Sequence, residues 1–138
     1  MAVMQYERVR LAAAVAAVIP VGLAVKFYVP GALGEWCHSY GAAILYEICC
    51  ALVLRLILPR LSPVVCGVLV FIGTCTLELL QLWHPPMLDA IRNTFLGAVT
   101  LGQSFDPWDF LYYAIGSALA VPVLTALRRP DLRGRSIC

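Results

Sequence analysis

The sequence predicts an all-α integral membrane protein. It has four transmembrane helices, a short re-entrant or interfacial helix between the third and the fourth, and both termini in the cytoplasm. Of its 138 residues, 62% are hydrophobic and only 13% are charged, whereas a soluble domain carries about 25% charged residues. The apolar residues form runs long enough to cross a bilayer, and the basic residues gather on one side of the resulting topology. We therefore treat residues 1–138 as a single membrane domain.

Four apolar segments are long enough to span a hydrocarbon core of about 30 Å, which takes about 20 helical residues. They lie at about residues 11–29, 40–58, 64–83 and 108–127. The first resembles a signal peptide because Arg8 and Arg10 precede it. However, its apolar run is longer than an ordinary signal-peptide core, and no small-residue cleavage site closes it before Lys26. We expect it to remain as a transmembrane helix.

The distribution of basic residues predicts the orientation. With the N-terminus inside, eight of the ten basic residues lie on the cytoplasmic side: Arg8, Arg10, Arg55, Arg60, Arg128, Arg129, Arg133 and Arg135. Cytoplasmic loops of membrane proteins carry this excess. The outer side then holds Lys26 and Arg92. It also holds a belt of aromatic residues, Trp36, Tyr40, Trp83, Trp108, Tyr112 and Tyr113, as is typical of a membrane interface.

Residues 86–103 are apolar enough for a helix but do not fit a fifth span. Three polar residues fall in the first two turns: Asp89, Arg92 and Asn93. A crossing here would also place the arginine-rich C-terminal tail outside, against the charge rule. We therefore expect a re-entrant or interfacial helix on the outer side, with Gly97 and Gly102 permitting the turn back.

A polar stripe occurs on the third span. Thr74, Glu78 and Gln81 lie at i, i+4 and i+7, so they share one helix face. An ionised carboxylate at the depth of Glu78 is costly unless it is paired, protonated or hydrated. Arg92 is the nearest basic residue in this topology, so pairing it with Glu78 would be the cheapest arrangement.

Two interpretations of this region stay open, and they do not exclude each other. In the first, an outward-facing polar pocket receives a headgroup, and its residues are Glu78, Gln81, Asp89, Arg92, Asp109 and Tyr113. In the second, a salt bridge pins the re-entrant helix to the third span. In either case we expect Arg92 within salt-bridge range of Glu78, Asp89 or Asp109, because an unpaired buried guanidinium is costly.

Several other polar residues have structural explanations. Asp106 is suited to be the N-cap of the fourth span, with Pro107 at its first position and Asp109 in its first turn. Glu47 lies within the second span, where a carboxylate is either functional or protonated and hydrogen-bonded to a neighbouring Tyr or Thr. Arg55 is expected to extend to the cytoplasmic surface.

The cysteines and histidines do not predict a metal site. The six cysteines follow no C-x-x-C or Cys/His spacing: Cys37, Cys49, Cys50, Cys66, Cys75 and Cys138. A free Cys in an apolar run behaves as a small hydrophobic residue. His38 and His84 lie near the outer interface. Axial ligation of a haem or a chlorophyll by either is chemically feasible, but a single histidine at a helix end is typically interfacial, so no cofactor is predicted.

A resemblance to a known family rests on residues 78–116. The residues that carry it are Glu78, Gln81, Pro85, Asp89, Arg92, Gly97, Gly102, Phe105, Asp109, Tyr113 and Gly116. This pattern resembles an uncharacterised bacterial family of small four-helix membrane proteins, a domain of unknown function for which a ribosome-maturation name is also in use. It is more distantly similar to VanZ-like proteins, which are linked to low-level glycopeptide resistance. The resemblance covers about residues 41–120 and implies a multi-pass protein of a bacterial inner or plasma membrane, or of an internal membrane.

Two functional hypotheses follow. The first is a protein that binds an anionic envelope lipid or lipid-linked headgroup, with Arg92 meeting the phosphate. The second is an accessory or structural subunit docked on a larger membrane protein complex, whose polar cluster only holds the fold. An intramembrane hydrolase using Glu78, His84 and Asp89 is less favoured, because no H-E-x-x-H or G-x-S-x-G pattern accompanies these residues. The expected partners are membrane lipids or a membrane complex, and not nucleic acid, because no basic binding surface is present.

Overall fold

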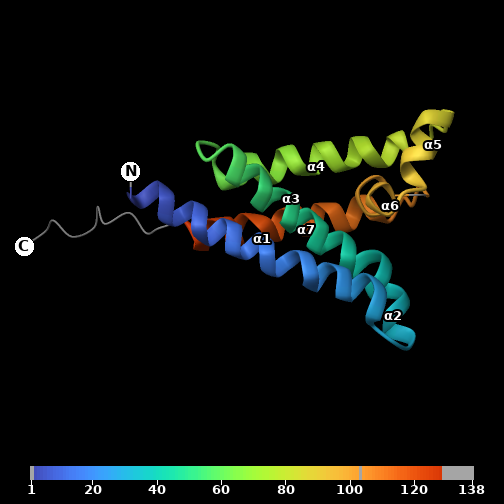
Figure 1. Cartoon of the computed structure of the whole chain (residues 1–138), viewed down its shortest axis with the longest axis horizontal. Helices are drawn as coiled ribbons and strands as arrows, with labels where there is room; N and C mark the ends of the chain where they lie inside the picture. The colour runs from blue at the N-terminus through green and yellow to red at the C-terminus, as the bar shows by residue number, and fades with distance from the viewer. Residues whose placement is uncertain (1, 103, 129–138) are drawn as a thin grey trace, which may run out of the picture.

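Long apolar helices form the framework of the molecule (Figure 1). The computed structural model describes residues 2–102 and 104–128, and within these ranges it contains no strand. The long helices are α1 (Ala2–Tyr28), α3 (Ala42–Ile57), α4 (Pro63–Leu80) and α7 (Asp109–Leu127). A short helix α2 (Ala32–Trp36) and a π-helical turn η1 (Cys37–Gly41) lead without a break into α3.

Four helical stretches are long and apolar enough to cross a membrane: Gln5–Tyr28, Ala32–Ile57, Pro63–Leu80 and Asp109–Leu127. The prediction of four helices of spanning length is therefore confirmed. The second stretch begins at Ala32 and not near residue 40, because the helix continues through α2 and η1, beyond the apolar run. Part of the sequence-based prediction falls outside the described residues. This part comprises three arginines used for the orientation and one of the six cysteines: Arg129, Arg133, Arg135 and Cys138.

The centre of the bundle is formed by α3 and α7. α3 packs against α1, α4 and α7, and α7 also packs against α4. Small residues on α7 allow this close approach: Gly116 and Ala120, four residues apart, are both buried, as expected for a packing face. A Cβ atom on Gly116 would lie 2.6 Å from Glu47 Cβ and 3.0 Å from the Ile44 carbonyl oxygen. Only glycine fits at this crossing.

The segment between α4 and α7 forms two short helices and not the single helix expected. These are α5 (Pro86–Arg92) and α6 (Phe95–Leu101), of seven residues each. A helix of this length rises about 10 Å, so neither can cross a membrane. Both lie at the end of the bundle opposite the N-terminus, which we call the α6 end (Figure 1).

The break between the two short helices follows from local chemistry. Thr94 caps α6, because its hydroxyl oxygen accepts a hydrogen bond from Gly97 N at 3.0 Å. Gly97 packs on the backbone of Ile91, where a Cβ atom would collide. The chain turns back after α6 at Gly102, whose φ of 69° favours glycine. Two glycines were expected to permit the turn. Gly102 adopts the turn conformation, whereas Gly97 allows α6 to pack closely on the end of α5.

At the N-terminal end of the bundle, Arg55 forms a buried ion pair. The residue is 4% exposed, and its guanidinium donates to Glu7 Oε1 from Nε at 3.1 Å and from Nη2 at 2.8 Å. The expectation that Arg55 extends to the surface is wrong. Glu7 lies on α1, which packs along α3, so the carboxylate is close enough to hold the guanidinium inside the bundle.

Candidate functional site

Glu78 on α4 is the centre of a hydrogen-bond network at the α6 end. Its side chain is fully buried. Oε1 accepts a hydrogen bond from Asp106 N at 2.8 Å, and Oε2 accepts one from the Tyr113 hydroxyl at 3.1 Å. Gln81 Nε2 also donates to Oε2, at 3.1 Å. Three donors offset the cost of burying the carboxylate and tie α4 to α7 and to the loop before it.

Gln81 links this network to the end of α6. Its Nε2 donates a second hydrogen bond to the Leu101 carbonyl oxygen at 2.8 Å. Because both partners of Nε2 are acceptors, the orientation of the amide is determined by them. Gln81 Oε1 is buried and has no hydrogen-bond partner among the described residues. Gln81 therefore holds the loop with one end of its amide and keeps an acceptor at the other.

Arg92 is buried in a different environment from the one expected. Its Nη2 donates to the Leu80 carbonyl oxygen at 2.9 Å, and its Nη1 donates to the Trp83 carbonyl oxygen at 3.0 Å. These carbonyls lie at and just after the C-terminal end of α4, where the helix dipole favours a cation. Arg92 also pairs with Asp89 Oδ1 at 3.2 Å.

The predicted ion pair between Arg92 and Glu78 is wrong, since the ion pair that Arg92 makes among the described residues is with Asp89. The physical reason is that α4 ends between the two groups. The Leu80 and Trp83 carbonyl oxygens accept hydrogen bonds from the guanidinium, while a backbone N–H and two side-chain donors satisfy Glu78. The broader expectation that Arg92 lies in salt-bridge range of one of three named carboxylates is confirmed for Asp89.

A cavity of about 630 Å³ lies beside the Glu78 network, between α1, α3, α4, α6 and the start of α7. Three of the six predicted site residues line it: Gln81, Asp109 and Tyr113. Glu78, Asp89 and Arg92 are not part of its lining. Three of the predicted site residues therefore face the cavity, and the other three hold neighbouring helices and loops together.

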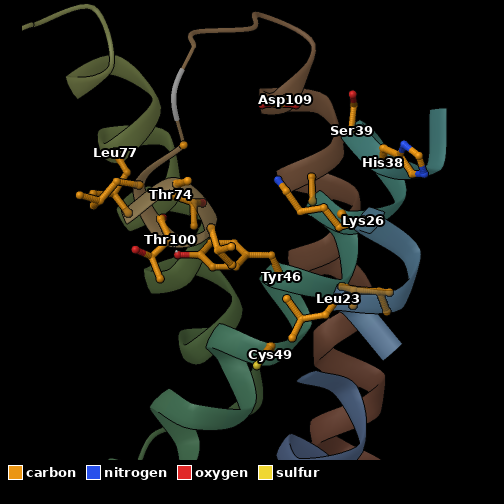
Figure 2. A pocket seen from close by; sticks show the side chains of 18 of the residues that line it. Leu23, Lys26, His38, Ser39, Tyr46, Cys49, Thr74, Leu77, Thr100 and Asp109 are labelled. Carbon is orange, nitrogen blue, oxygen red and sulfur yellow. Dashed lines mark hydrogen bonds between the residues drawn. The ribbon is translucent and has the colours of Figure 1, made fainter. Parts of the chain in front are cut away.

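The cavity is polar at one end and apolar at the other. Figure 2 shows Asp109, Ser39 and His38 at one end, and Leu23 and Cys49 toward the other. Further apolar lining comes from Val18, Ile19, Leu45, Leu77 and Val99. The Lys26 amine points into the cavity on the side of the α7 turn that carries Asp109 (Figure 2). A molecule with a polar head and an apolar body matches this arrangement.

Lys26 is a charged lining residue that the sequence does not assign to the site. The sequence places Lys26 only among the two basic residues of the outer side, and the predicted topology makes Arg92 the basic residue nearest to Glu78. The signal that could have identified Lys26 is its position near the end of an otherwise apolar helix, four residues after Gly22. The proximity of Lys26 to α7 results from the packing of the helices, and no local sequence pattern predicts it.

Asp106 organises the start of α7. Oδ1 accepts a hydrogen bond from Trp108 N at 3.0 Å, and Oδ2 accepts one from the Tyr40 hydroxyl at 3.3 Å. The regular helix begins at Asp109, so Asp106 stabilises the turn before it and is not the N-cap residue itself. Tyr40 stacks on Tyr112, with ring centroids 4.2 Å apart, which joins α7 to η1.

Glu47 forms a second buried carboxylate site at the centre of the bundle. It is fully buried on α3, and its Oε2 accepts a hydrogen bond from the Ser117 hydroxyl on α7 at 2.5 Å. Thr74 on α4 also interacts with this carboxylate, in agreement with the expected tyrosine or threonine partner, and Ser117 is a further partner that the sequence does not indicate. Tyr113 and Ser117 are four residues apart, so one face of α7 holds both buried glutamates.

The histidines lie in two different environments. His38 lines the cavity from η1, and His84 Nδ1 lies 3.2 Å from Asp89 Oδ1 outside it. Within residues 2–102 and 104–128, no group of three or more His, Cys, Asp or Glu residues is arranged to hold a metal ion. The five described cysteines are free thiols.

Comparison with known proteins gives one match. A family model described as "Protein of unknown function (DUF2809)" matches residues 32–117, more than half of the chain. The match includes α2 to α6 and the Tyr113 face of α7, and therefore the Glu78 network and most of the cavity lining. No curated protein and no solved structure shows a significant match.

Proposed function

We propose that this chain, which belongs to the DUF2809 family of proteins of unknown function, binds a membrane lipid or lipid-linked molecule whose head carries an anionic group. The observation that supports this is the cavity of about 630 Å³, with its apolar walls and its polar end at Lys26 and Asp109. Ligand cavities typically measure about 300–1,000 Å³, so the size fits part of a lipid.

The apolar walls and the cation supply separate parts of the binding energy. The acyl chain leaves hydrocarbon and not water, so the apolar walls at Leu23 and Leu77 contribute van der Waals packing and a shape that fits the chain. The Lys26 ammonium binds a phosphate oxygen as a point charge. In this proposal Lys26, and not Arg92, meets the anionic group, because Arg92 is occupied by the carbonyls of Leu80 and Trp83.

The proposal includes the topology predicted from the basic residues. Both termini lie in the cytoplasm of a bacterial inner or plasma membrane, and the α6 end faces outward. The polar end of the cavity then lies near the outer leaflet, at the depth of lipid headgroups. The similarity to VanZ-like proteins stays a prediction and adds no residue role to this proposal.

A second candidate is the accessory or structural subunit of a larger membrane complex. Three of the six predicted site residues act inside the protein and not on the cavity. Glu78 holds α7 and its preceding loop, while Arg92 and Asp89 hold the end of α4. A cluster that served only to maintain the fold would have this arrangement.

Purification in mild detergent tests the two candidates. Lipid should co-purify with the full chain, and Lys26→Gln should reduce its amount, as measured by mass spectrometry of the extracted lipid. Arg60→Gln is the matched control, because Arg60 is an exposed cation that does not line the cavity. A stoichiometric protein partner without bound lipid would favour the accessory subunit, and equal lipid in the two variants would reject the role of Lys26.

A further inference from the structure

Resting on the proposed function, we infer that the head of the ligand carries an ammonium group beside its phosphate, so that the ligand is a phosphoethanolamine-type amphiphile. The polar end of the cavity carries more acidic than basic side chains. One cation, Lys26, lines this end together with two carboxylates, Asp106 and Asp109. Glu78 lies directly behind this end, and both of its oxygens already accept hydrogen bonds from the protein.

The three carboxylates differ in how much acceptor capacity the protein already uses. Both oxygens of Asp106 accept hydrogen bonds, from Trp108 N and the Tyr40 hydroxyl. Both oxygens of Glu78 are also occupied, by three donors. The half-buried Asp109 carboxylate has no hydrogen bond or ion pair among the described residues. Asp109 is therefore the carboxylate that can accept from a ligand.

A second acceptor lies in the same cavity lining. Gln81 Oε1 is buried without a protein donor among the described residues, and its orientation follows from the two acceptors that hold Nε2. Buried acceptors are costly when they stay unsatisfied. A ligand that brings N–H donors satisfies them, whereas a head with phosphate oxygens alone brings further acceptors.

A purely anionic head is disfavoured for a further electrostatic reason. It would place negative charge near Asp109 and Asp106, with Lys26 as the only cation among the described lining residues. Like charges in a partly dry site oppose binding and give selectivity against the wrong ligand. A phosphate at Lys26 with an ammonium at Asp109 leaves each charge with an opposite partner.

Binding of two lipids with identical acyl chains tests this inference. The full-length protein in nanodiscs or detergent is titrated with phosphatidylethanolamine and with phosphatidylglycerol, which lacks the ammonium. We expect the first to bind about tenfold more tightly, the effect of one charge-assisted hydrogen bond. Asp109→Asn should abolish this preference, because it removes the acceptor for the ammonium and also the charge that repels phosphatidylglycerol, whereas Lys26→Gln should weaken the binding of both lipids. Glu35→Gln, an exposed carboxylate outside the cavity, should change neither.

The outcomes separate the inference from the proposed function. If the unmodified protein binds phosphatidylglycerol as tightly as phosphatidylethanolamine, the inference is overturned and lipid binding stands. If it binds neither, the proposed function fails. If Lys26 and Asp109 merely pair with each other, Asp109→Asn will lower stability but leave the preference unchanged, which also overturns the inference.

A measurement on the unmodified protein avoids dependence on variant folding. Soluble phosphoethanolamine and glycerol 3-phosphate both carry the phosphate, and only the first carries the ammonium. Phosphoethanolamine should displace a bound fluorescent lipid at about one tenth of the concentration needed for glycerol 3-phosphate. Equal potency would count against the ammonium subsite.

Discussion

The Tyr113 hydroxyl donates a hydrogen bond to Glu78 Oε2 at 3.1 Å, across the interface between α7 and α4. One turn further along α7, the Ser117 hydroxyl donates to Glu47 on α3. The two contacts join three of the four long helices through one face of α7. They fix the rotation of α7 and hence the position of Asp109 at the polar end of the cavity.

Glu78→Gln should destabilise the protein although it preserves the shape of the side chain. The new amide NH₂ group would replace one of the two carboxylate oxygens. It would then face either the Asp106 N–H or the Tyr113 and Gln81 donors, so two buried donors would oppose each other. We expect a loss of about 1–3 kcal/mol in the free energy of unfolding. Tyr113→Phe should cost about 1 kcal/mol. Thermal unfolding in detergent measures both, with the exposed Tyr28→Phe as a neutral control.

Arg92→Lys should lower the amount of folded protein in the membrane. The guanidinium reaches the carbonyls of Leu80 and Trp83 with two different nitrogens, and a single ammonium cannot reproduce this fork. Lipid bound per folded molecule should stay unchanged, because Arg92 does not line the cavity. Normal abundance with lost lipid binding would instead restore the role of Arg92 as the phosphate ligand. Arg60→Lys is the exposed control.

Gly116→Ala should weaken the packing of α7 on α3. The new Cβ would lie 2.6 Å from Glu47 Cβ and 3.0 Å from the Ile44 carbonyl oxygen, so the helices must separate. We expect a loss of about 1–3 kcal/mol in stability. Gly73→Ala on α4 is the matched control, since its Cβ would meet nothing within 4 Å. Equal unfolding temperatures for the two variants would show that α3 and α7 do not approach as closely as described.

Thiol labelling in intact cells tests the orientation. Variants that keep a single cysteine are treated with a membrane-impermeant thiol reagent, with any outer membrane made permeable. Cys37, at the α6 end, should react in intact cells. Cys138, which lies outside the described residues, should react only after the cells are opened. Labelling of Cys138 from outside would contradict the placement of the C-terminus in the cytoplasm.

The sequence by itself determined the helical framework, because that information is local. Apolar runs of spanning length and the backbone's need for internal hydrogen bonds predict four long helices. Helical periodicity places Thr74, Glu78 and Gln81 on one face, and all three are buried. The small residues Gly116 and Ala120 likewise indicated a packed face on α7.

Only the tertiary structure decided which polar groups meet, because each such contact joins segments far apart in the chain. Glu78 accepts a hydrogen bond from Asp106 N, 28 residues later, and Arg92 is held by the Leu80 and Trp83 carbonyls, whose location depends on where α4 ends. Lys26 reaches the cavity through the packing of α1 on α3. Periodicity specifies the face of a helix on which a residue lies, but the packing of several helices specifies the partner that this face meets.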